Sequence, residues 1–175
     1  MPSSRLVSSG FRPQWLLAGL LWLSASAWSH TVLENTALLG MSPEQVTSIL
    51  ADAQPVRSPR RLPSGALGSL RVADALCEGA HFEQTLFFAH QKLAQMDLIL
   101  LNPASGPGAE EALTRMQTAL LQSLRARLGS ELAAGDSASW VSADADVMLF
   151  RSGRPEHPSL RVVIKLRQLV DAGEL

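Results

Sequence analysis

The residues from Phe82 to Asn102, FEQTLFFAHQKLAQMDLILLN, decide the fold. From Phe82 to Ala89, Phe, Gln, Leu and Phe alternate with Glu, Thr, Phe and Ala, the period of two that places successive side chains on opposite faces of a sheet. His90, Gln91 and Lys92 form a polar tip. In the second arm one face carries Ala94, Met96, Leu98 and Leu100, while Ile99 and Leu101 add apolar residues to the other face near its end. The stretch predicts a β-hairpin that holds most of the apolar mass, with an outer face that begins polar and ends covered.

The first 29 residues have the pattern of a secretory signal peptide. Arg5 and Arg12 give a positive start, and the apolar run from Trp15 to Leu23 is too short to span a bilayer stably. Small residues allow cleavage after Ala27 or after Ser29. The alternative is a retained membrane anchor. We therefore divide the chain into a signal peptide, 1–29, and a single α+β domain, 30–175, and expect a periplasmic or secreted protein.

Composition narrows the classes of partner. The chain is 46% hydrophobic and 18% charged, which is ordinary for a globular protein. Removal of the signal peptide takes away two of the 15 basic residues and none of the 16 acidic ones, which leaves a net charge of −3. No affinity for nucleic acid is expected at that charge. Cys77 is the single cysteine, so the chain forms no internal disulfide and has no lipid-accepting cysteine near the cleavage site. The mature chain is expected to contain no integral membrane span.

Two helices are predicted. Ser42-Pro43-Glu44-Gln45 forms a capping box with proline at the first helical position, and Gln54-Pro55 ends the helix. The stretch from Glu110 to Leu128 has a stripe of apolar residues at steps of three and four, and Gly129 stops it. The stripe consists of Leu113, Met116, Leu120, Leu121, Leu124 and Leu128. We expect this face to pack on the hairpin.

The remaining segments complete the predicted sheet. Pro55 to Gly68 is rich in Pro, Ser and Gly and is predicted to be a loop. Its three arginines, Arg57, Arg60 and Arg61, form either an anion-binding patch or a solvated connection. Further strands are predicted at Leu67–Val72, Trp140–Arg151 and Leu160–Gln168, the last two joined by a turn at Ser152–Pro155. The expected fold is α+β, an antiparallel sheet of four to five strands with two helices packed on one face.

One stretch resembles a known family. Leu39-Gly40-Met41-Ser42-Pro43-Glu44-Gln45-Val46, followed by Ile49-Leu50 and Pro55, is similar to the helix opening of the small exported BamE-like modules, a design also used by β-lactamase inhibitor proteins. The resemblance covers roughly residues 39–101. It implies helices paired with an antiparallel sheet that binds other proteins. The BamE proteins are lipoproteins, whereas this chain lacks a lipid-accepting cysteine, so their role in outer-membrane assembly does not carry over.

Residues with metal-binding or catalytic chemistry form no complete motif. Cys77, His81 and His90 could supply a thiolate and two imidazoles, but a straight strand would hold the two histidines about 30 Å apart. Asp144 and Asp146 could chelate calcium, yet no EF-hand loop surrounds them, and the alternative is a bend. The chain contains no nucleophile elbow, HExxH motif or phosphate-binding loop. No cofactor, metal or catalytic residue is therefore predicted.

The candidate binding site is the final strand. Arg161, Lys165 and Arg167 are predicted to share one face with Val163 between them, a basic stripe that could bind a protein surface. Alternatively, these charges keep an edge strand soluble. In either case, replacing Arg161 and Arg167 by Glu is expected to leave folding nearly unchanged.

The predicted function is that of an exported, non-catalytic protein-binding or structural module of the cell envelope, whose partner would be an envelope protein. The alternative is a small metal-binding or hydrolytic periplasmic protein.

Overall fold

The computed structural model describes residues 32–133, 137–154 and 157–167. The predicted signal peptide lies outside the described residues. The elements in chain order are α1 (Val32–Ala37), α2 (Pro43–Ile49), β1 (Gln54–Arg61), β2 (Leu67–Cys77), β3 (Ala80–Ala89), β4 (Lys92–Leu100), α3 (Ala109–Leu128), β5 (Ser137–Val141), β6 (Ala145–Arg154) and β7 (His157–Leu166).

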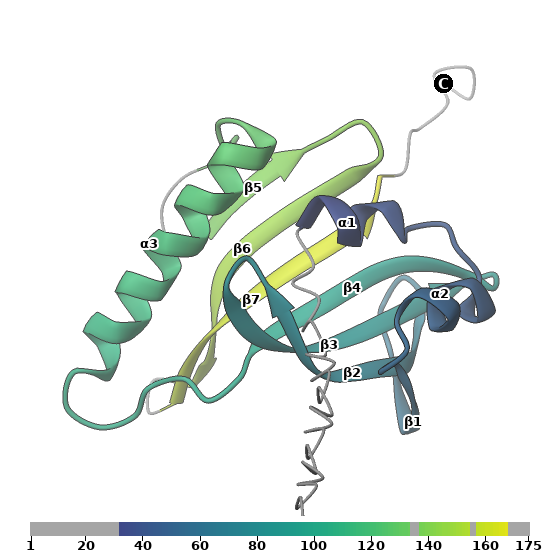
Figure 1. Ribbon diagram of the computed structural model, residues 1–175, viewed down its shortest axis with the longest axis horizontal. Helices are drawn as coiled ribbons and strands as arrows, with labels where there is room; N and C mark the ends of the chain where they lie inside the picture. The colour runs from purple at the N-terminus through teal and green to yellow at the C-terminus, as the bar shows by residue number, and fades with distance from the viewer. Residues whose placement is uncertain (1–31, 134–136, 155–156, 168–175) are drawn as a thin grey trace, which may run out of the picture.

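The seven strands form one sheet in the order β1-β2-β3-β4-β7-β6-β5 (Figure 1). Every neighbouring pair is antiparallel. The prediction of four to five strands with two helices is therefore wrong, because the described chain is mostly sheet, with one long helix and two short ones. The connection from β4 through α3 to β5 places the last three strands beside the first four, with β7 next to β4.

Two segments account for the additional strands. Residues 54–61 form β1 where a loop was predicted. Prolines and arginines are tolerated there because β1 is at the edge of the described sheet and, among the described strands, pairs only with β2. The predicted strand Trp140–Arg151 is divided into β5 and β6 by a tight turn. In that turn the Ser142 amide donates to the Ala145 carbonyl at 2.8 Å, and the Ala145 amide donates to Ser142 Oγ at 3.1 Å.

The hairpin that the sequence predicted is β3–β4. His90 and Gln91 form its two-residue turn, and both have positive φ, 50° and 62°, as a type I′ turn requires. A bulge beside Phe88 pairs that residue with Leu93 and turns Leu93 into the core. The outer face was expected to be covered near the end of the second arm, but Ile99 is 40% exposed there.

The capping box is confirmed at the start of α2. The Gln45 amide donates to Ser42 Oγ at 3.3 Å, and the Ser42 amide donates to the Gln45 side chain at 2.9 Å. Two backbone hydrogen bonds at 2.8 Å, from Gly40 to Leu93 and from Leu93 to Met41, attach the α1–α2 connection to the start of β4. Within α1, buried Asn35 accepts from Gln84 at 3.3 Å, so both short helices are tied to the sheet.

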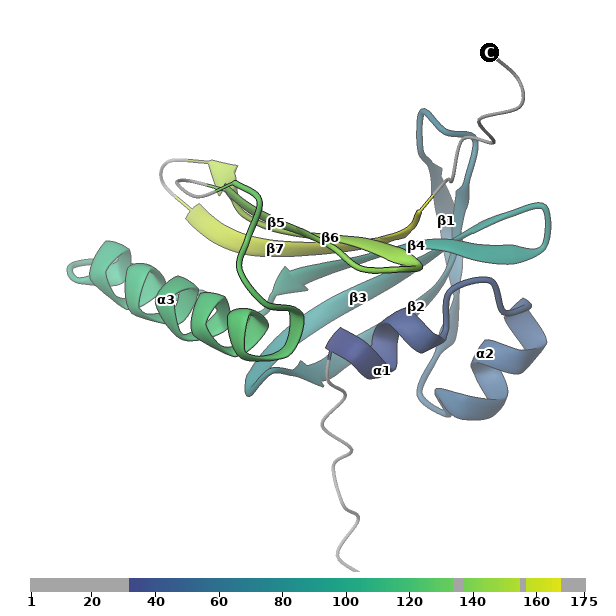
Figure 2. The ribbon, with the colours of Figure 1, turned by 90° about the horizontal axis from the view of Figure 1, so that it is seen from above.

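The apolar stripe of α3 faces the core as predicted. Leu113, Leu120 and Leu124 are buried, and Met116, Leu121 and Leu128 are partly buried against them. The helix lies closest to β7 and β5, not to the β3–β4 hairpin on which it was expected to pack (Figure 2). The reason is that β7 pairs with β4, so that β7, β6 and β5 extend the sheet beyond the hairpin. The helix packs on this extension.

Polar contacts fix α3 from both ends. Arg151 of β6 donates to Gln117 and Thr114, both at 2.8 Å, and pairs with Glu110. At the other end Glu78, in the β2–β3 turn, accepts from Arg127 at 2.8 Å and from Ser123. These contacts hold the helix on one face of the sheet.

Candidate functional site

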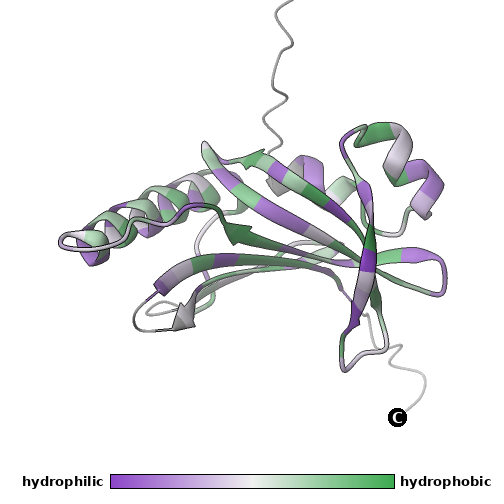
Figure 3. Cartoon of the chain, turned by 90° about the horizontal axis from the view of Figure 1, so that it is seen from below, coloured by the Kyte–Doolittle hydropathy of each residue, from purple (hydrophilic) through white to green (hydrophobic). Residues whose placement is uncertain are grey.

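The helices α1, α2 and α3 lie on one side of the sheet, and no described residue forms a helix on the other side (Figure 2). We call this second side the outer face. Hydrophobic and hydrophilic residues alternate along the strands (Figure 3), which is why one face forms the core and the other remains partly polar. Across β3, β4, β7 and β6, the outer-face residues Thr85, Asp97, Val163 and Met148 stand opposite one another. In the next row, Ile99, Arg161 and Phe150 are aligned.

Asp97 is the centre of a polar cluster on this face. Its side chain is 1% exposed, and Arg60 Nη2 of β1 approaches its Oδ2 at 2.9 Å. Arg161 Nη2 of β7 donates to the same oxygen, and Gln95 Nε2 donates to Oδ1 at 2.8 Å. We call Arg60, Gln95, Asp97 and Arg161 the Asp97 cluster. Because two guanidinium groups share one carboxylate, the cluster has a net charge of +1.

The two arginines of the cluster also cover aromatic rings. The Arg60 guanidinium carbon lies 5.1 Å from the centre of the Phe87 ring, and that of Arg161 lies 5.6 Å from the Phe150 ring. Phe87 is thereby fully buried although it points to the outer face. Gly68 lies beside it, and a Cβ there would come within 2.8 Å of the Phe87 ring. Each of the two guanidinium groups therefore lies over an aromatic ring on the outer face.

The four predicted site residues differ in their burial and in their partners. Arg161 is held by Asp97 and its side chain is 25% exposed, while Val163 is buried at 4%. Lys165 Nζ lies 3.5 Å from Asp146 Oδ2. Arg167 follows the end of β7 and donates to the Ser142 carbonyl at 3.2 Å. The stripe is present along β7, but Arg161 shares the Asp97 carboxylate with Arg60, and Lys165 pairs with Asp146. Among the described residues, Arg167 has no acidic partner.

Apolar residues complete the outer face, and among them the sequence analysis had placed Ile99 there. Ile99 is 40% exposed and Val141 is 43% exposed, while Met148 and Phe150 are half-buried. Arg60 was considered only as part of a possible anion-binding patch, and its pairing with Asp97 was missed because the two residues are 37 positions apart. One signal was available, since an Asp at an alternating position of a predicted strand has to be either exposed or paired.

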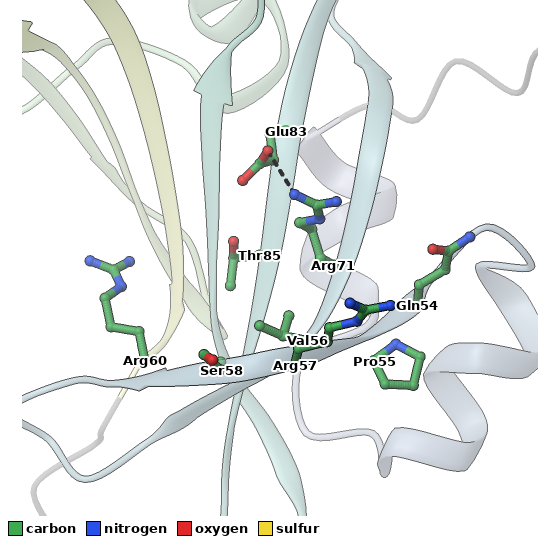
Figure 4. Close-up of a pocket in the computed structure, with 10 residues that line it drawn as sticks. Gln54, Pro55, Val56, Arg57, Ser58, Arg60, Arg71, Glu83 and Thr85 are labelled. Carbon is green, nitrogen blue, oxygen red and sulfur yellow. Dashed lines mark hydrogen bonds and ion pairs between the residues drawn. The ribbon is translucent and has the colours of Figure 1, made fainter.

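A groove opens on the outer face beside β1. Four residues of β1, 56–59, stand opposite a single residue of β2, because the pairing passes from Pro55–Leu70 to Arg60–Gly68. This wide bulge separates the strands and leaves a cavity of about 490 Å³. Its lining includes Val56, Arg57, Arg60, Arg71, Glu83 and Thr85 (Figure 4). Arg71 Nη1 pairs with Glu83 Oε2 at 3.2 Å across the groove floor.

The candidate metal ligands do not come together. Cys77 pairs with Ala80 in the β2–β3 ladder and faces the core, whereas His81 pairs with Leu76 and is exposed beside Asp74, with Nδ1 at 2.6 Å from Oδ1. His90 lies at the opposite end of β3. Burial raises the pKa of the Cys77 thiol to about 12, and the neighbouring Glu78 carboxylate adds to this rise. A thiol with this pKa is a poor nucleophile and a poor metal ligand at neutral pH.

Asp144 and Asp146, the two candidate calcium ligands, have different structural roles. Asp144 is exposed in the turn between β5 and β6, which matches the bend weighed from the sequence, and Asp146 pairs with Lys165. Within residues 32–133, 137–154 and 157–167, no three His, Cys, Asp or Glu side chains are grouped as a metal site requires.

Comparisons with protein-family models, with curated proteins and with solved structures found no match to this chain. In the part of the chain that the structure describes, no helix is both long enough and apolar enough to cross a membrane.

Proposed function

We propose that this protein is an exported, non-catalytic binding module of the cell envelope, and that the outer face of its sheet binds another protein. The observation that carries the proposal is a sheet face that no described helix covers and that exposes Ile99 and Val141 beside half-buried Met148 and Phe150. Buried on association, such residues would supply the apolar centre of an interface.

The composition of this face supports the same conclusion. Aromatic residues, Met and Arg are enriched at protein interfaces, and Phe150, Met148 and Arg161 are neighbours on β6 and β7. Arg161 is fixed by Asp97, so little side-chain entropy would be lost when a partner binds. Lys165 and Arg167 lie farther along and are more exposed, where charge chiefly affects specificity and association rate. The resemblance to BamE-like modules, which bind proteins through a sheet, favours the envelope as the location.

Export is tested by the N-terminus of the protein recovered from the periplasm or medium. Cleavage after Ala27 or after Ser29 would leave a chain that begins at Trp28 or at His30. Intact-mass spectrometry is expected to show one of these two masses. Recovery of the exported protein with Met1 still attached would contradict the proposal.

The binding face is tested by two matched isoleucines. Ile99 lies on the outer face and is 40% exposed, while Ile49 lies on α2 and is 50% exposed. We expect Ile99→Gln to weaken capture of the envelope partner at least tenfold, because removing one buried isoleucine from an interface forfeits about 1.5 to 3 kcal/mol. Ile49→Gln is expected to bind as the wild type does.

Affinity capture from envelope extract, quantified across a range of salt concentrations, measures this difference. Glutamine is chosen because it adds no charge beside Arg161, which stands opposite Ile99. Both variants are first checked for wild-type melting behaviour. Equal recovery of partners by wild type and Ile99→Gln would exclude the outer face as the binding site.

A further inference from the structure

The groove beside β1 is lined by arginines from two strands. Arg57 lines it and forms no ion pair or side-chain hydrogen bond with any residue that the structure describes. Figure 4 shows Arg57 and Arg71 on one side of the groove, Arg60 at the other end, and Thr85 rising from β3 between Arg60 and Arg71. Three arginines from β1 and β2 therefore line one cavity.

Pairing among the described residues leaves two of these positive charges uncompensated. Glu83 neutralises Arg71 at 3.2 Å. The Asp97 cluster retains one positive charge, since Arg60 and Arg161 share a single carboxylate. Arg57 adds another. The groove thus presents a net charge of +2, next to hydroxyl groups from Ser58 and Thr85 that can donate hydrogen bonds.

We propose that this groove binds the phosphate group of a phosphate monoester. Such a group carries a charge of about −1.5 to −2 at neutral pH and three acceptor oxygens, which complement the guanidinium forks of Arg57 and Arg71. A carboxylate would match one of the two charges. The cavity of about 490 Å³ is within the range of small-molecule sites, so it has room for an organic part against Val56 and Pro55.

Arg71 would engage the ligand by leaving Glu83. The ion pair between them is half-exposed, with side-chain exposures of 48% and 38%, so water screens it and its loss costs little. Glu83 therefore competes with the phosphate for the same guanidinium group. This site does not depend on the protein-binding face, because Ile99 is outside the groove lining.

Titration of the purified exported protein with phenyl phosphate, in phosphate-free buffer of low ionic strength, tests the proposal. Calorimetry is expected to show saturable binding of one ligand per chain. Arg57→Gln is expected to weaken binding roughly tenfold, as expected for the loss of one charge-assisted contact. Glu83→Gln is expected to tighten binding several-fold, because Arg71 is then released.

Arg115→Gln is the matched control, since Arg115 is an exposed arginine on α3, on the other side of the sheet. Circular dichroism confirms the fold of each variant. Vesicles of phosphatidylcholine with and without phosphatidate distinguish the source: Arg57-dependent sedimentation with phosphatidate assigns a lipid headgroup, and phenyl phosphate binding without it assigns a soluble monoester. Failure of both probes to bind, or equal losses for Arg57→Gln and Arg115→Gln, would overturn the site.

Discussion

Leu124→Ala is expected to lower the free energy of unfolding by about 2 to 5 kcal/mol. Leu124 is fully buried on α3, among the residues that join the helix to the sheet. Its truncation removes apolar contacts and leaves a cavity, because the helix is held at both ends by Arg151 and Glu78 and cannot readily collapse into the space. A loss of this size is a large part of the stability of a single domain.

Gln122→Ala is the control for this prediction. Gln122 is exposed on the same helix, and its replacement is expected to change the free energy of unfolding by about 0.5 kcal/mol or less. Urea denaturation of the two variants measures the difference. Equal midpoints would show that the leucine stripe does not face the core.

Arg161→Glu is expected to lower the free energy of unfolding by about 3 kcal/mol. The substitution removes one of the two cations that hold Asp97, whose side chain is 1% exposed, and adds a negative charge near it. It also removes the guanidinium group that covers Phe150. The expectation from sequence that reversing Arg161 and Arg167 together would leave folding nearly unchanged did not include the pairing of Arg161 with Asp97.

Arg167→Glu is the control for Arg161→Glu. Arg167 is exposed, and its side chain donates only to the Ser142 carbonyl among the described residues, so its reversal is expected to be nearly silent. Urea denaturation again provides the measurement. If Arg161→Glu proves as stable as Arg167→Glu, then Asp97 does not depend on Arg161 for its burial.

The elements that sequence predicted correctly are those fixed by neighbouring residues. The capping box at Ser42, the leucine stripe of α3 and the β3–β4 hairpin each follow from a short-range pattern. β1 was missed because its prolines and arginines resemble a loop, and only pairing with β2 makes it a strand. The turn between β5 and β6 depends on two hydrogen bonds at Ser142. The alternation of residues along Trp140–Arg151 does not indicate this turn.

The candidate site was less accessible to sequence reasoning. Alternation placed Arg161, Val163 and Lys165 on one face, and the structure places them there. Their charge, however, depends on Asp97 and Asp146, which only the strand order brings alongside. Arg60 reaches Asp97 across β2 and β3, a contact that no local pattern encodes. Electrostatic pairing across a sheet is thus set by topology.

Photo-crosslinking from position 99 tests the proposed binding face most directly. A benzophenone amino acid replaces Ile99 in the exported protein in living cells, and Ile49 receives the same residue as the control. The account predicts a discrete crosslinked product with an envelope protein from position 99 and none of that size from position 49. No product from position 99, or the same product from both positions, would contradict the claim that the outer face of the sheet binds a partner.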